Sequence, residues 1–127
     1  MSRPLQGIRV LDLTWVLAGP FSSMILADLG ANVIKLEEPG PPTGRRAEQA
    51  GNLSTVPPPR YGVDRHTPNW ALNHNKKTIG LNLKHDEARQ IFYQLAVRAD
   101  VVVEEFRPGV AKRLGIDYDT LRQRNPR

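Results

Sequence analysis

Two short polar clusters hold the residues of this sequence best suited to bind a small anionic molecule. The first, at residues 73–77, reads NHNKK and offers amides and two ammonium groups in one turn. The second, at residues 105–109, reads EFRPG; its Phe106 could stack on a purine. Arg113, one turn into the helix expected next, could pair with a phosphate. Each cluster alone is typical of an ordinary surface turn, but together they indicate a pocket for a phosphorylated, base-containing ligand.

Candidate nucleophiles and metal ligands are sparse. Ser22 and Ser23 lie in the first turns of an expected helix, outside a G-x-S-x-G elbow, where serines are usually caps or exposed polar residues. Asp12 lies among apolar residues and needs donors, so we expect a structural role for it, bonded to nearby backbone or to the Thr14 hydroxyl. The sequence has no cysteine, and its three histidines lack metal-ligand spacing, so we expect no metal site.

The stretch at residues 10–37, VLDLTWVLAGPFSSMILADLGANVIKLE, would position these groups. An apolar strand at residues 7–13 leads to a tight turn, and Pro20 suits the first position of the helix that follows. Gly30 stands where a left-handed helix cap is favoured, and a second strand follows at residues 31–37. This order predicts a right-handed parallel βαβ unit, whose first turn lies where open α/β sheets bind ligands.

A long proline- and glycine-rich loop is expected at residues 38–70. Seven of the eleven prolines fall in this segment, which has no hydrophobic periodicity and exceeds the usual connection length. Two interpretations stay open for it. It is either a solvated linker, or a mobile flap that carries Arg45 or Arg46 toward a phosphate.

Strand and helix patterns alternate again beyond the loop. We expect a strand at residues 78–83, an amphipathic helix at 85–99, and a β-branched strand at 100–104 that is covered on both faces. Two short helices follow: one runs from Pro108 to Gly115, and the other is capped by Asp117 and terminated at residues 125–126. The fold class is therefore α/β, a doubly wound parallel sheet with flanking helices, and it is unfinished because such folds usually have five or more strands.

Composition limits the partners. The net charge of +5 fits either an anionic ligand or arginines scattered over a solvated surface. The sequence lacks nucleic-acid-binding signatures, a membrane-spanning apolar run and a signal peptide, so we expect no nucleic acid and no membrane as partners. The absence of cysteine fits a cytoplasmic protein.

Three ordered blocks resemble one protein family. The strings PLQGIRVLDLTWVLAGPFSSMILADLGANVIKLEEPG, NHNKKTIGLNLK and ADVVVEEFRPGVAKRLGIDYDTLRQRNPR are similar to the amino-terminal part of the family III CoA-transferases, and the resemblance covers nearly the whole chain apart from residues 47–67. That family includes formyl-CoA transferase, carnitine CoA-transferase and the alpha-methylacyl-CoA racemases. The resemblance implies a Rossmann-like large domain, of which residues 1–127 form an incomplete CoA-binding part, in an interlocked homodimer.

The resemblance also implies an activity. CoA would move between carboxylic acids, with acyl-CoA and a small carboxylic acid as substrates and no tightly bound cofactor. The family's nucleophilic aspartate would lie beyond Arg127, so we expect no catalytic residue in this chain and no turnover by it alone. Two alternatives stay open: a racemase acting on the alpha carbon, and a truncated, non-catalytic module that binds CoA.

CoA contacts can be carried over at matching positions. Leu17 and Ala18 would line the pocket through their backbone, and Leu81 and Lys84 would surround the adenine and its phosphates. Phe106 would stack near the adenine. The resemblance further implies that Arg113 reaches a phosphate.

The sequence also departs from the family pattern. Trp15 stands where formyl-CoA transferase has a histidine, and Glu38 stands where it has an arginine, which removes one phosphate contact. The usual G-D-x-T-R after the second strand is altered to GPPTGRR. The NKK at residues 75–77 is the transferase form of a motif that is richer in arginine in racemases, which favours the transferase interpretation.

Overall fold

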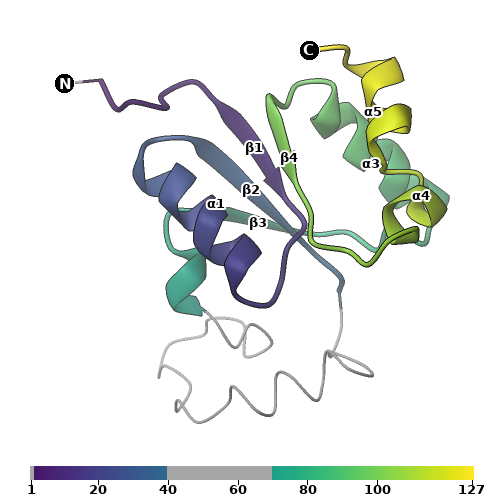
Figure 1. The fold of residues 1–127 in the computed structure, drawn as a ribbon, viewed down its shortest axis with the longest axis horizontal. Helices are drawn as coiled ribbons and strands as arrows, with labels where there is room; N and C mark the ends of the chain where they lie inside the picture. Colours follow the sequence, from purple (N-terminus) through teal and green to yellow (C-terminus); the bar gives the residue numbers. More distant parts are fainter. Residues whose placement is uncertain (1, 40–69) are drawn as a thin grey trace, which may run out of the picture.

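The computed structural model describes residues 2–39 and 70–127 of the chain. Along the chain the elements are β1 Arg9–Asp12, α1 Ala18–Asp28, β2 Asn32–Glu37, the 3-10 helix η1 Trp70–Asn73, β3 Lys77–Gly80, α3 Asp86–Ala96, β4 Val101–Val103, α4 Val110–Leu114 and α5 Tyr118–Arg124 (Figure 1). This order matches the strand and helix order expected from the sequence. The proline- and glycine-rich segment at 38–70, including Arg45 and Arg46, lies outside the described residues except at its ends.

The four strands form one parallel sheet in the order β3-β2-β1-β4. In β1, Val10 pairs with Val33 of β2 on one side and with Val101 of β4 on the other. The chain therefore adds β2 and β3 on one side of β1 and then crosses over to add β4 on the other side. This reversal is the switch point of a Rossmann-type sheet, and ligands bind there beyond the carboxyl ends of the strands.

Helices cover both faces of the sheet (Figure 1). On one face, α1 packs against η1, β1 and β2, around a small apolar cluster that includes Val10, Ala27 and Val33. On the other face, α3, α4 and α5 pack over a larger cluster centred on Leu11 and Phe92. Neighbouring residues of β1 thus face opposite layers, as a strand buried on both faces requires. Within the described part of the chain, no helix has the length and apolar character needed to cross a membrane.

Helix α1 begins earlier than the sequence suggests. It starts at Ala18, so Pro20 is its third residue and the prediction that proline takes the first position was wrong. Proline is tolerated there because the amides of the first helical turn have no partner within the helix. At the other end, Gly30 has φ +104°, and the predicted left-handed conformation at this position is confirmed.

All four strands are shorter than predicted: β1 spans Arg9–Asp12 where residues 7–13 were expected, and β2 begins one residue later than expected. β3 ends at Gly80, and the chain then leaves the sheet with Leu81 and Leu83 buried against the larger core cluster. β4 spans only Val101–Val103, and the expectation that it is covered on both faces was wrong: Val101 is 39% exposed because β4 is an edge strand among the described residues.

The carboxyl-terminal helices follow their sequence signals. Helix α4 ends at Leu114 and is capped by Gly115, which adopts the left-handed conformation, although the helix begins at Val110 rather than at Pro108. The Asp117 side chain accepts a hydrogen bond from the backbone N–H of Thr120, which confirms the predicted cap of α5. Helix α3 ends at Ala96, three residues before the predicted boundary, and the Asn125 side chain binds the carbonyl groups at this end.

Candidate functional site

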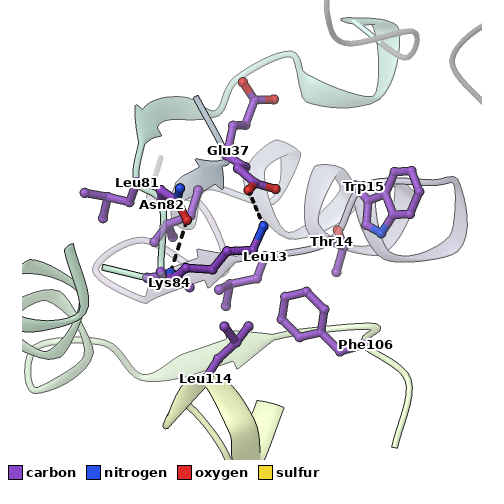
Figure 2. Close-up of a pocket in the computed structure, with 12 residues that line it drawn as sticks. Leu13, Thr14, Trp15, Glu37, Leu81, Asn82, Lys84, Phe106 and Leu114 are labelled. Atoms are coloured by element: carbon purple, nitrogen blue, oxygen red, sulfur yellow. Dashed lines mark hydrogen bonds and ion pairs between the residues drawn. The ribbon is translucent and has the colours of Figure 1, made fainter. Parts of the chain in front are cut away.

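A pocket of about 240 Å³ opens beyond the carboxyl ends of β1, β2 and β3 (Figure 2). It lies at the sheet edge where the Rossmann-type order places ligands. Its lining residues are Leu13, Thr14, Trp15, Leu36, Glu37, Glu38, Leu81, Asn82, Leu83, Lys84, Phe106 and Leu114.

Three of the six predicted CoA-contacting residues line this pocket: Leu81, Lys84 and Phe106. They come from segments that are far apart in the sequence, and the fold brings them to one cavity. The other three, Leu17, Ala18 and Arg113, are not among its lining residues. Leu17 is 60% exposed, and Arg113 is an exposed residue next to Leu114, which does line the pocket. The binding roles of all six residues stay predictions.

The pocket combines apolar walls with a charged mouth. Leucines from the ends of the strands and from α4 form much of the wall together with the Phe106 ring (Figure 2); they are Leu13 just after β1, Leu36 in β2, Leu81 and Leu83 after β3, and Leu114 in α4. At the mouth, Lys84 Nζ donates to Glu38 Oε1 at 2.9 Å. Both side chains are substantially exposed, at 70% for Lys84 and 41% for Glu38. A flat apolar group therefore fits against Phe106, while the ammonium group expected to meet a phosphate already has a carboxylate partner.

A second carboxylate, Glu105, fixes the wall formed by the β1–α1 turn. Its Oε1 accepts hydrogen bonds from the backbone N–H groups of Trp15 at 2.6 Å and Val16 at 2.9 Å, and its Oε2 accepts one from Gly19 at 3.3 Å. The turn is tight: a Cβ built on Gly19 would lie 2.3 Å from the Cβ of Thr14. Sequence reasoning missed this role of Glu105. The available signal was an acidic residue directly after the strand expected at residues 100–104.

Asp12 is the centre of a buried polar network under the same turn. Its carboxylate is 0% exposed and accepts from the Thr14 backbone N–H at 2.9 Å, from the Thr14 hydroxyl at 2.5 Å and from the Ser23 hydroxyl at 2.6 Å. The structural role expected for Asp12 is confirmed. The interpretation of Ser23 as a cap or exposed residue was wrong because Ser23 is fully buried against Asp12, whereas Ser22 is exposed as expected.

Two buried ammonium groups complete the network. Lys76 Nζ lies 3.0 Å from Asp12 Oδ2 and Lys35 Nζ lies 3.6 Å from the same atom, and both side chains are almost fully buried. Burial raises the pKa of Asp12, but the Lys35 charge and hydrogen bonds from Ser23 and Thr14 outweigh it and hold the pKa below its usual value. Burial also lowers the pKa of Lys35, against the opposing effect of Asp12.

The NHNKK cluster faces helix α1 and not the pocket. Lys76 donates to Asp12, to the Pro20 carbonyl at 2.9 Å, to Ser23 at 2.8 Å and to the Asn73 side chain at 3.0 Å. The prediction that this turn offers two ammonium groups to a ligand was therefore wrong, since Lys76 is buried and engaged.

His74 and Asn75 of the cluster bind the end of α1, whereas Lys77 is exposed at the start of β3. His74 Nε2 lies 3.1 Å from Asp28 Oδ1, and the Asn75 amide donates to the same oxygen at 2.8 Å. Hydrogen bonds to the Ala71 carbonyl and to Asp28 raise the pKa of His74 above its usual value. The cluster thus holds η1 and the segment before β3 against α1, and through the contact of Lys76 with Asp12 it supports the β1–α1 turn.

The site has the character of a binding pocket more than of a reaction centre. The Thr14 hydroxyl donates to Asp12, and Lys84 is paired with Glu38. In the described ranges, no group of three or more His, Cys, Asp or Glu side chains could hold a metal ion.

Comparison with known proteins identifies the family. The sequence profile described as CoA-transferase family III matches residues 5–127. The chain belongs to this family. It is 43% identical over 126 residues to a probable fatty acyl-CoA transferase, Rv3272, of Mycobacterium tuberculosis, covering 98% of this chain and 30% of that protein. It is 44% identical over 124 residues to the acetyl-CoA:oxalate CoA-transferase of Acetobacter aceti, covering 98% of this chain and 29% of that protein.

Solved structures of CoA-transferase family III relatives agree with the fold. An orthorhombic crystal structure of Rv3272 matches with a TM-score of 0.80 at 42% identity, covering 98% of this chain and 32% of that chain. A CAIB/BAIF family protein from Brucella suis matches with a TM-score of 0.75 at 33% identity, again over 98% of this chain and 32% of that chain. The chain therefore spans about a third of the length of its solved relatives, in their CoA-transferase fold.

Proposed function

We propose that residues 1–127 are an incomplete, Rossmann-like CoA-binding domain of an enzyme that moves CoA between carboxylic acids. The observation that carries this proposal is the meeting of Leu81, Lys84 and Phe106 in one pocket at the switch point of the sheet. These are residues to which the family resemblance assigns CoA contacts. Acyl-CoA and a small carboxylic acid are the proposed substrates, and CoA binds as a substrate rather than as a tightly held cofactor.

The pocket supports a definite orientation of the ligand. The adenine packs against Phe106 and the neighbouring leucines, where an aromatic platform and apolar wall favour a base. The phosphates extend toward the mouth, where Lys84 meets them once it exchanges Glu38 for the stronger, more highly charged partner. Arg113, one residue from the lining residue Leu114, is the proposed second phosphate contact.

This proposal assigns no catalytic residue to the chain. Transfer between carboxylates needs a carboxylate that attacks the thioester carbonyl, and the resemblance places that aspartate beyond Arg127. Three of the described aspartates have clear structural roles. Asp12 is buried in an ionic network, Asp28 binds His74 and Asn75, and Asp117 caps α5.

The transferase proposal is favoured over the two alternatives. The NKK motif at residues 75–77 has the transferase form, and the curated relatives described above are named transferases. An alpha-methylacyl-CoA racemase would bind the same CoA moiety but would exchange the alpha proton of its substrate. A non-catalytic module would bind CoA without either reaction.

Calorimetry with CoA tests the binding proposal on the 127-residue polypeptide. We expect saturable binding of CoA and no binding of adenosine at the same concentration, because adenosine lacks the phosphates. Transfer and alpha-proton exchange are then assayed with several acyl-CoA donors and carboxylate acceptors. We expect neither reaction from this polypeptide alone; a lack of CoA binding would refute the binding proposal.

We further propose a homodimeric, cytoplasmic enzyme for the whole protein, with no membrane or nucleic-acid partner. The interlocked homodimer is implied by the family resemblance, and the cytoplasmic location is supported by the cysteine-free composition of the chain. Ultracentrifugation of the full-length protein and fractionation of cells that produce it test these two points.

A further inference from the structure

The Glu105 carboxylate lies at the amino end of α1, a position where nucleotide-binding folds often bind an anionic ligand. It accepts from the backbone N–H groups of Trp15, Val16 and Gly19, which precede and begin α1. The amino end of a helix carries exposed N–H groups and a partial positive charge, so it favours an anion. Here the chain supplies that anion itself, from a segment about 90 residues away in the sequence.

Glu105 also joins two walls of the pocket. Trp15, whose N–H it binds, is a lining residue of the β1–α1 turn. Phe106, the next residue after Glu105, is a lining residue of the segment that follows β4. The ladder between β1 and β4 reaches this point through the hydrogen bond from Leu13 N–H to the Val103 carbonyl at 2.9 Å. Beyond that bond, the Glu105 carboxylate links the β1–α1 turn to the segment that follows β4.

We propose that Glu105 is a positioning residue of the CoA pocket, acting as an internal anion that fills the amino end of α1 and sets the separation of Trp15 from Phe106. This inference rests on the proposed function, since the pocket is taken to bind CoA. It has a consequence for the binding mode: the phosphates of CoA do not reach the α1 amides, and they bind instead at the Lys84 side of the pocket.

The test uses the variants Glu105→Ala and Glu105→Gln with Glu104→Gln as the matched control. Glu104 is the adjacent acid. Among the described residues, the hydrogen bond to its carboxylate comes from Phe106 N–H at 2.7 Å, which the side-chain carbonyl of a glutamine can still accept. Loss of charge-assisted hydrogen bonds predicts that Glu105→Ala weakens CoA binding about ten-fold or more by calorimetry. Glu105→Gln keeps one acceptor oxygen and should lose less, whereas Glu104→Gln should bind like the unaltered chain.

Added formate distinguishes a role of Glu105 as an anion from a role in which its side chain only fills space. Removal of the Glu105 side chain in Glu105→Ala vacates an anion site, and a small carboxylate can occupy it. Formate should therefore raise the melting temperature of Glu105→Ala and restore much of its CoA affinity. It should have neither effect on the unaltered chain or on Glu104→Gln, and chloride at equal ionic strength should not replace it.

The outcomes separate the inference from the proposed function. If the unaltered chain binds no CoA, the proposed function fails, while the formate effect on melting temperature still tests the anion site. If the unaltered chain binds CoA and Glu105→Ala binds it equally well, the inference about Glu105 is overturned. If Glu105→Ala does not fold, Glu105→Gln decides, and unchanged affinity in a folded Glu105→Gln also overturns it.

Discussion

Asp12 is the residue on which the geometry of the β1–α1 turn most depends. One buried carboxylate holds the Lys76 ammonium group at 3.0 Å, with that of Lys35 nearby, and also accepts from Thr14 and Ser23. Burying charges is unfavourable unless each is paired and hydrogen-bonded. The network therefore stabilises the fold only while it is complete. Without the Asp12 charge, the buried Lys35 and Lys76 ammonium groups keep uncharged acceptors such as the Pro20 and Thr14 carbonyl groups but lose the carboxylate that both of them contact.

We predict that Asp12→Asn lowers the free energy of unfolding at pH 7 by about 3–5 kcal/mol, the range for breaking a buried ion pair from one side. Urea unfolding followed by circular dichroism measures this change. Asp28→Asn is the control because Asp28 also binds polar side chains but lies at the surface. Equal loss in both variants would show that the buried position of Asp12 has no special importance.

The effect of Asp12→Asn should depend on pH. The folded-state pKa of Asp12 lies below its ordinary value of 3.8, so the charged carboxylate stabilises the folded chain above about pH 4. This contribution is lost as the pH falls from 3.8 through the folded-state pKa, where Asp12 takes up a proton. The stability difference between the unaltered chain and Asp12→Asn should therefore shrink below pH 4. A difference that stays constant between pH 7 and pH 3 would contradict this.

The Glu38–Lys84 pair predicts opposite effects of two variants on CoA affinity. Glu38→Gln should strengthen binding about two- to five-fold, because an exposed ion pair is worth at most about 1 kcal/mol and Lys84 no longer has to leave its partner. Lys84→Gln should weaken binding. In the double variant the gain from Glu38→Gln should disappear, as expected for a direct interaction. Calorimetry at two salt concentrations tests both effects, which should diminish at high ionic strength.

At the scale of elements, the end of α3 is held by a side chain from the end of α5. The Asn125 amide donates to the carbonyl groups of Ala96 at 3.0 Å and Ala99 at 2.9 Å, with a longer bond to Val97. The last carbonyl groups of a helix have no partner within it, so a donor from outside satisfies them. Asn125 thereby fixes the packing of α5 on α3. These helices cover the larger core cluster, against which Phe106 and Leu114 also pack.

We predict that Asn125→Ala destabilises the chain by about 1–2 kcal/mol through loss of these hydrogen bonds. Asn125→Asp should destabilise it more, although aspartate has nearly the same shape, because its charge would face carbonyl oxygens at the negative end of the α3 dipole. Thermal unfolding at neutral pH ranks the stabilities of the two variants. A less destabilised Asn125→Asp than Asn125→Ala would show that packing matters here and not hydrogen-bond donation.

At the scale of the whole molecule, local sequence patterns sufficed for the order of the elements but not for the polar contacts between them. Hydrophobic periodicity and cap residues gave the alternation of strands and helices, the Gly30 and Gly115 conformations and the Asp117 cap. The buried role of Lys76 depends on its contacts with Asp12 and Ser23, which lie 64 and 53 residues away in the sequence. No local pattern distinguishes such a lysine from an exposed one.

The pocket, too, was predictable from the sequence only in part. The carboxyl ends of parallel strands meet at one edge, so Leu81, Lys84 and Phe106 could be expected together from topology and resemblance. Glu105 could not, because its role depends on the distance between two turns. The exposure of Leu17, at 60%, was equally beyond local sequence patterns.

The outer face of α1 predicts self-association of the 127-residue polypeptide. Four large apolar residues recur at intervals of four from the amino-terminal cap of this helix to its carboxyl-terminal cap, and each is substantially exposed: Leu17 60%, Phe21 48%, Ile25 41% and Leu29 41%. Residues four apart form one ridge on a helix, so these side chains make a continuous apolar stripe. Such stripes on a helix surface favour burial against another apolar surface.

Ultracentrifugation over a range of concentrations should therefore detect oligomers of this polypeptide. The variants Phe21→Gln and Ile25→Gln, which interrupt the stripe at its centre, should shift it toward the monomer without lowering its melting temperature. Ile91→Gln is the matched control, because Ile91 is 43% exposed but lies on α3, outside the stripe. If all three variants reduced association equally, exposed apolar area in general would be responsible. If only Ile91→Gln reduced it, the interface would lie on the α3 layer and the role assigned to α1 would be wrong.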